Sequence, residues 1–228
     1  MTSSFASHDG LSRALGRVLW AVVGAGALAT AGVGCRPKDP ALSGPWKDDF
    51  ERSALGSDWR DTGGSYTVAG GKLWAANAHN HPLWLARRLP SDLVVEVDVA
   101  STSPDGDIKL ELFGDGASFD PDMGEYTSTG YVFVFGGWHN ALSVICKGNE
   151  HGQGRKAERG DRKVVPNQTY HWTIRRKDGL LEWQVDREPF LSWRDPAPLT
   201  GSDHAYLAVN DWETRVSFDN LVIQPVAP

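Results

Sequence analysis

Disulfide bonds and long apolar segments are both missing from this chain. Only two cysteines, Cys35 and Cys146, occur among its 228 residues, so no disulfide framework can hold the fold. The apolar run at residues 18–29 is shorter than the ~20 residues that a membrane-spanning helix needs. The remainder offers no helix-length apolar stripe and no internal repeat of fixed period, so we expect neither a helical bundle nor a solenoid.

Basic residues are too few for a nucleic-acid-binding protein. Lys and Arg number 23 against 29 Asp and Glu, which gives a formal net charge of −6 at pH 7. Because such a chain repels polyanions, we expect no nucleic-acid partner. Hydrophobic residues make up 40% of the chain and ten residues are tryptophan, which is enough for the core of one ordinary domain.

The N-terminal segment is typical of an exported protein. Arg13 and Arg17 precede the apolar run, and small residues lead up to Cys35. This order predicts an export signal over residues 1–34. Cys35 resembles the cysteine of a bacterial lipobox, which implies acylation, a membrane anchor and a Pro-rich tether over residues 35–45. The alternatives are an ordinary cleaved signal and an uncleaved anchor, so we expect a lipoprotein at the cell envelope or a secreted protein.

Short segments of alternating or apolar residues fill the rest of the chain. The pair Asp178-Gly179 separates two such runs and predicts an antiparallel hairpin over residues 173–185. Closely spaced short strands with turn residues between them are typical of a β-sandwich. The other expected strands are residues 65–68, 72–75, 83–87, 93–100, 108–113, 130–135, 143–147, 163–165, 204–210 and 216–223.

The order of these segments resembles the concanavalin A-like lectin/glucanase superfamily. The entry Trp46-Lys-Asp-Asp-Phe50, the strand Asp-Leu-Val-Val-Glu-Val-Asp-Val at 92–99 and the closing strands are nearest to the 3-keto-disaccharide hydrolase-like domain family. The resemblance implies an all-β fold, with two antiparallel sheets in a jelly roll over residues 46–228. It also implies a carbohydrate ligand, but a fold-level likeness does not imply a reaction.

Side chains that suit a sugar flank the expected strand at residues 143–147. Pyranose rings stack on the face of an indole, and their hydroxyls bond to planar amides and carboxylates. A Trp-containing loop before the last strand is expected, from the resemblance, to border the same groove. The alternative is a glycine turn that packs Trp138 inward. The predicted ligand-binding residues are Trp138, His139, Asn140, Asn149, Glu150, His151, Asp211 and Trp212.

An enzyme is one alternative to a binding module. A glycoside hydrolase or lyase would use Glu150 as acid or base, assisted by His139 or His151, and a hydrolase needs a second carboxylate ~5 to 10 Å away. The nearest candidates in the sequence are Glu111, Asp211 and Glu213. The other alternative is a structural surface protein without a glycan site, in which Trp138 and Trp212 would both be buried.

The Glu-x-Asp pattern at Glu96 and Asp98 resembles the catalytic strand of concanavalin-like glucanases. Ala100 stands where the second glutamate would be, so the catalytic pair is absent and we predict binding without fast hydrolysis.

His79 and His81 would point the same way on an extended strand and could bind a metal. Because no third ligand accompanies them, we predict no metal and no cofactor.

Two further segments bear on the groove. Residues 107–111 alternate strictly, so Asp107, Lys109 and Glu111 should share one face of a strand, either a groove floor or a solvated surface. Residues 147–163 are basic and rich in glycine, which predicts a loop that could attract acidic sugars. Cys146 lies in an apolar strand and is expected to be a buried, inert thiol.

Overall fold

The computed structural model describes residues 39–119 and 127–226 of the chain. Contacts divide the chain into two units, Met1–Pro37 and Lys38–Pro228, and every described element belongs to the second. The predicted export signal and Cys35 lie outside the described residues. Among the residues described, no helix is long and apolar enough to cross a membrane.

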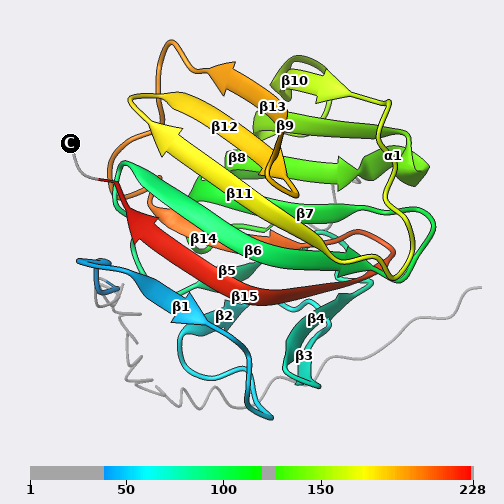
Figure 1. Cartoon of the computed structure of the whole chain (residues 1–228). Helices are drawn as coiled ribbons and strands as arrows, with labels where there is room; N and C mark the ends of the chain where they lie inside the picture. Colours follow the sequence, from blue (N-terminus) through cyan, green and yellow to red (C-terminus); the bar gives the residue numbers. More distant parts are fainter. Residues whose placement is uncertain (1–38, 120–126, 227–228) are drawn as a thin grey trace, which may run out of the picture. The chain divides into compact units, whose positions relative to one another are not determined.

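The described strands form two antiparallel sheets that lie one behind the other (Figure 1). The eight-stranded sheet has the order β13 (Glu188–Arg194), β12 (Leu180–Val185), β11 (Tyr170–Lys177), β6 (Leu93–Ser101), β15 (Arg215–Pro225), β4 (Lys72–Ala76) and β3 (Tyr66–Ala69), with β1 (Trp46–Asp48) also paired to β15. The seven-stranded sheet has the order β10 (Arg155–Arg159), β9 (Leu142–Asn149), β8 (Thr127–Gly136), β7 (Ile108–Gly114), β14 (Tyr206–Asn210), β5 (Leu83–Leu85) and β2 (Trp59–Asp61). Two short helical turns, α1 (Gly137–Asn140) and η1 (Gly152–Gly154), flank β9. The predicted all-β sandwich is confirmed.

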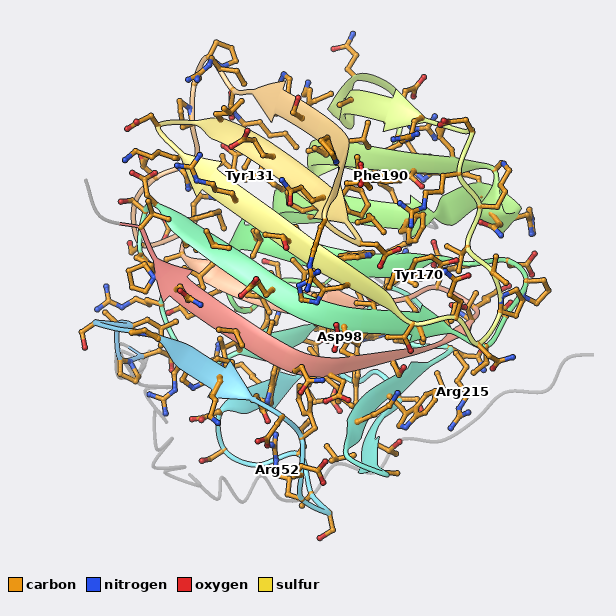
Figure 2. All side chains as sticks on the ribbon, viewed as in Figure 1. Arg52, Asp98, Tyr131, Tyr170, Phe190 and Arg215 are labelled. Carbon is orange, nitrogen blue, oxygen red and sulfur yellow. The ribbon has the colours of Figure 1, made fainter. Side chains whose placement is uncertain are left out.

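The core lies between the inner faces of the two sheets. Along β6 the buried residues alternate with partly exposed ones, so Val95 and Val97 face the core and Glu96 faces outward. Phe135 of β8 meets Tyr170 and Phe190 of the opposite sheet edge-on, with ring centroids 5.0 and 5.3 Å apart. Figure 2 labels Tyr170 and Phe190 on that sheet. Such edge-to-face contacts stabilise the core beyond the effect of burying apolar area alone.

The hairpin predicted from the Asp-Gly pair is present. The hairpin at Asp178-Gly179 forms as predicted, with Lys177 opposite Leu180 in the ladder between β11 and β12. Both turn residues have positive φ, 48° and 75°, which is the backbone that a tight hairpin turn requires.

Three expectations about the body are wrong. Residues 163–165 form no strand. The expected loop at 147–163 instead contains β10, which pairs with β9 at the edge of its sheet. The body also begins before residue 46, because Ala41 bridges to Arg88 and Asp39 pairs with Arg60; part of the predicted tether therefore packs on the sandwich.

Candidate functional site

A pocket of about 370 Å³ lies over the outer face of the seven-stranded sheet. Ile108 and Leu110 of β7 point into the core, so Lys109 between them points outward. Loops and turns from five parts of the chain build the walls around this lysine. The pocket is lined by Asn80, Asp105, Asp107, Lys109, Trp138, His139, Glu150, His151, Trp212, Glu213 and Thr214.

The floor of the pocket is a buried ion network centred on Lys109. Its Nζ donates to Oδ1 of Asn80 at 3.0 Å and lies 3.1 Å from Oε2 of Glu150 and 3.5 Å from Oδ2 of Asp107. Burial alone would lower the pKa of Lys109, but the carboxylates of Asp107 and Glu150 outweigh it and raise the pKa above its usual value. The lysine is therefore held charged between two carboxylates.

One wall consists of two loops joined by backbone hydrogen bonds. The N–H of His79 donates to the carbonyl of Trp212, and that of Asn80 donates to the carbonyl of Asp211. The carboxylate of Asp211 accepts from the N–H groups of Ala78 and Thr214, at 3.0 Å each. Burial, together with the nearby charge of Asp107, raises the pKa of Asp211 to about 6 in spite of these bonds.

The opposite wall is a left-handed turn that carries Trp138. Trp138, His139 and Asn140 have φ of 52°, 55° and 59°, a region that costs a non-glycine residue ~1 to 2 kcal/mol. Asn140 holds this turn, because its amide donates to the carbonyls of Pro104 and Val164 and its Oδ1 accepts from the N–H of Val164. At Gly136 the φ is 69°, and a Cβ there would lie 2.6 Å from Asn140, so the turn needs a glycine at that position.

The segment after β9 folds back over the sheet toward this turn. The ring of His151 lies 5.6 Å from that of Trp138 in an edge-on contact, and the Arg155 guanidinium lies 4.0 Å from the Trp138 centroid. Glu150 is buried, with its Oε1 3.5 Å from Nε2 of His151. The residues that flank β9 at its two ends thus meet in one place, as predicted for Trp138 and Glu150.

The predicted ligand-binding residues separate into two groups. Trp138, His139, Glu150, His151 and Trp212 line the pocket. The other three, Asn140, Asn149 and Asp211, lie outside the lining: Asn140 and Asp211 hold the walls as described above, and Asn149 accepts from the N–H of His151. The indoles of Trp138 and Trp212 are both partly exposed, unlike the buried pair expected of a structural protein.

Sequence reasoning missed several of the lining residues. Asn80 stands between His79 and His81, and neither Asp105 nor Thr214 belongs to a motif. The alternation at residues 107–111 predicts that Asp107 and Lys109 share a face, but it does not tell a groove floor from a solvated surface. Strict alternation of charged and apolar residues along β7 is the one sequence signal for this floor. It does not reveal the pocket, because most of the loops that cover this face are distant in sequence.

Asp107, which is not one of the expected candidates, shares Lys109 with Glu150. The lysine Nζ lies 3.1 Å from Oε2 of Glu150 and 3.5 Å from Oδ2 of Asp107. A buried ammonium therefore stands between the two carboxylates, whereas the two carboxyl groups of a glycosidase flank the scissile bond of the sugar. Glu111 lies outside the pocket lining, where its Oε1 accepts from the N–H groups of Thr129 and Gly130.

The other suspected sites do not assemble. His79 lies edge-on to Trp212 with the ring centroids 5.0 Å apart, whereas His81 stacks on Phe119; the two histidines therefore face different neighbours. No metal-binding group of His, Cys, Asp or Glu is found among the described residues. Asp98 lies on the outer side of β6 in the other sheet (Figure 2), hydrogen-bonded to His171. Burial raises the pKa of the Cys146 thiol to about 12, which makes it a poor nucleophile.

Sequence comparisons give one partial match. A family model described as "Farnesoic acid 0-methyl transferase" matches residues 117–221, which is less than half of the chain. The matched segment contains every strand from β8 to β14 and the first part of β15. The match is a resemblance, and no residue takes a role from it. No curated protein matches the chain.

Solved structures match over most of the body. The carbohydrate recognition domain of Emp47p has a TM-score of 0.60 at 13% identity, over 85% of this chain and 100% of that one. The carbohydrate-binding module CBM66 from Bacillus subtilis has 0.57 at 14%, over 75% and 98%. A putative glycosyl hydrolase from Parabacteroides distasonis has 0.55 at 12%, over 81% and 94%. At these identities the likeness establishes the fold: the chain is a jelly roll of the concanavalin-like type.

Proposed function

We propose that this chain is a carbohydrate-binding protein of the cell envelope and that it holds a sugar in the pocket above Lys109. The observation that carries the proposal is the composition of that pocket. Two partly exposed indoles, Trp138 and Trp212, stand on separate walls over a floor of ionised and amide groups. Indoles take the C–H face of a pyranose, and fixed carboxylates and amides take its hydroxyls.

The fixed backbone of the site supports binding. Strained left-handed residues on both walls, Asn80 at 63° and Trp138 at 52°, persist only where surrounding contacts impose them, and such strain gathers at ligand sites. A preorganised pocket loses little entropy when its ligand arrives. The solved structures with this fold include proteins titled as carbohydrate recognition domains and a carbohydrate-binding module, which agrees with the proposal.

Anchoring to a membrane through acylated Cys35 is part of the same proposal. Its support is the sequence alone: two arginines, a short apolar run and small residues before the cysteine. The Cys35→Ser variant should move from the membrane fraction to the soluble fraction and keep its circular dichroism spectrum. Retention of Cys35→Ser on membranes would point to an uncleaved helical anchor.

The proposal is tested by a glycan array probed with the compact unit Lys38–Pro228. We expect a defined subset of glycans to bind with dissociation constants in the micromolar to millimolar range, ~4 to 8 kcal/mol. Reducing ends are measured on the same glycans after incubation with the protein. No glycan binding would reject the proposal, and robust turnover that disappears in Glu150→Gln would replace the binding module with a hydrolase.

A further inference from the structure

The charges of the pocket discriminate among sugars. Four carboxylates line it, from Asp105, Asp107, Glu150 and Glu213, against the ammonium of Lys109 and the imidazoles of His139 and His151. Asp105 and Glu213 stand at the rim on separate walls, with 54% and 61% of their side chains exposed, 3.5 and 3.9 Å from Nδ1 of His139 and of His79. An approaching ligand therefore meets exposed carboxylates from two segments of the chain.

The only lysine of the pocket lining has no capacity left for an anion. An ammonium has three N–H donors, and the Nζ of Lys109 already faces three acceptor side chains, those of Asn80, Asp107 and Glu150. The two histidines of the lining, His139 and His151, already lie beside Asp105 and Glu150, and Arg155 stacks on Trp138 and lies 4.0 Å from Glu158. A uronate or a phosphorylated sugar would therefore enter a negative pocket without gaining an ion pair.

The buried side of the pocket carries more negative than positive charge. Asp211 adds a third carboxyl group near the floor, beside Asp107 and Glu150, and all three act on the one ammonium of Lys109. A cationic ligand would relieve this excess. Tryptophan faces attract cations as well as sugar C–H groups, so the indole of Trp212, beside the rim carboxylate of Glu213, suits both parts of a positively charged sugar.

We infer that the ligand of this pocket is an amino sugar whose protonated amine is bound by the rim carboxylates of Asp105 and Glu213. The inference rests on the proposed function and narrows it to one class of sugar. It is the alternative to an acidic sugar attracted by residues 147–163, whose side chains Arg155, Arg159 and Arg162 lie beside Glu158, Asp161 and Asp186.

The test is calorimetric titration of the full-length protein with four compounds. These are tetramers of glucosamine, of N-acetylglucosamine and of galacturonate, and the polyamine spermidine. Titrations are run at low ionic strength and about pH 6.5, below the pKa of ~8 of an α-amino group. The variant Asp105→Asn/Glu213→Gln removes the two rim charges with little change in shape. Glu188→Gln, an exposed carboxylate on β13, is the matched control.

We expect the glucosamine tetramer to bind about ten-fold more tightly than the N-acetylated tetramer, because acetylation removes the charge. The double variant should lose most of this preference and keep its affinity for the N-acetylated tetramer, and Glu188→Gln should behave as the wild type. Equal binding of the two tetramers, or tighter binding of galacturonate, would overturn the inference and leave the proposed function standing. Spermidine binding as tightly as the glucosamine tetramer, or no binding of any of the three tetramers, would also overturn the inference, whereas the glycan array decides the proposed function.

Discussion

Replacement of Lys109 by methionine is the perturbation that bears most directly on the architecture of the site. Methionine fills a similar volume, so the change removes the ammonium and little packing. Lys109 is 3% exposed and contacts Glu150 and Asp107 at 3.1 and 3.5 Å. Breaking a buried ion pair from one side costs ~3 to 5 kcal/mol, because the remaining charge is left uncompensated. We expect Lys109→Met to lose this much free energy of unfolding at neutral pH.

The loss should depend on pH in a defined direction. Without the ammonium, one of the two carboxylates takes up a proton more readily in the folded protein than in the unfolded chain. The folded variant then binds more protons than its unfolded state, so its stability rises as the pH falls. The difference from the wild type should therefore be largest near pH 7 and clearly smaller near pH 5. Urea denaturation at the two pH values, followed by tryptophan fluorescence, measures it.

Two matched variants make the result specific. Lys47→Met removes an exposed lysine from β1 and should change stability by less than ~0.5 kcal/mol. Lys109→Met/Glu150→Gln removes one charge of each sign and should recover part of the loss. If Lys109→Met cost less than ~1 kcal/mol and the same amount at both pH values, the ammonium would not be what holds the two carboxylates together.

Three further variants test the two walls of the pocket and one ion pair elsewhere in the sandwich. The pKa of Asp211 is raised from 3.8 to about 6 by burial, so its charged form destabilises the fold as the pH rises from about 4 to 6; urea denaturation of Asp211→Asn should show a flatter pH dependence over that range. Asp195 pairs with Lys147 and accepts from Tyr131, and these contacts outweigh burial to lower its pKa. Asp195→Asn should lose ~2 kcal/mol at neutral pH, and the difference from wild type should shrink as the pH falls below the usual pKa of 3.8 and acid protonates Asp195; thermal unfolding between pH 7 and pH 3 measures it. Gly136→Ala should weaken glycan binding on the array while the protein still folds, because its new Cβ would collide with Asn140 and displace the turn. Unchanged binding would show that the turn does not need a glycine at this position.

The fold was largely predictable because it depends on local patterns. Alternation along residues 93–100 and 108–113, and the Asp-Gly turn at 178–179, survive in β6, β7 and the hairpin of β11 and β12. The prediction failed at β10, residues 155–159, whose basic and glycine-flanked sequence is typical of a loop. Its strand conformation comes from pairing with β9 at the sheet edge, a tertiary effect that outweighs composition.

The candidate site was predictable only where its residues are close in sequence. Trp138 and Glu150 flank one strand, and the pattern around them sufficed to place both in a single pocket. Asn80 comes from a distant segment and meets Lys109 only because β14 lies between β7 and β5, the strand that follows Asn80. Asn140 looked like a ligand residue, but three hydrogen bonds to neighbouring segments occupy its amide. Amides that bind ligands and amides that hold loops have the same sequence signature.

The most direct test of the account is to titrate the best glycan of the array against tryptophan variants. Trp138→Ala and Trp212→Ala remove the two indoles of the pocket. Trp74→Ala removes a partly exposed indole on the other sheet, which stacks with Arg215. If the pocket above Lys109 holds the sugar, each pocket variant should weaken binding at least ten-fold, or ~1.4 kcal/mol, and Trp74→Ala should bind as the wild type. Unchanged affinity in both pocket variants, or a loss confined to Trp74→Ala, would contradict the account and place the sugar elsewhere.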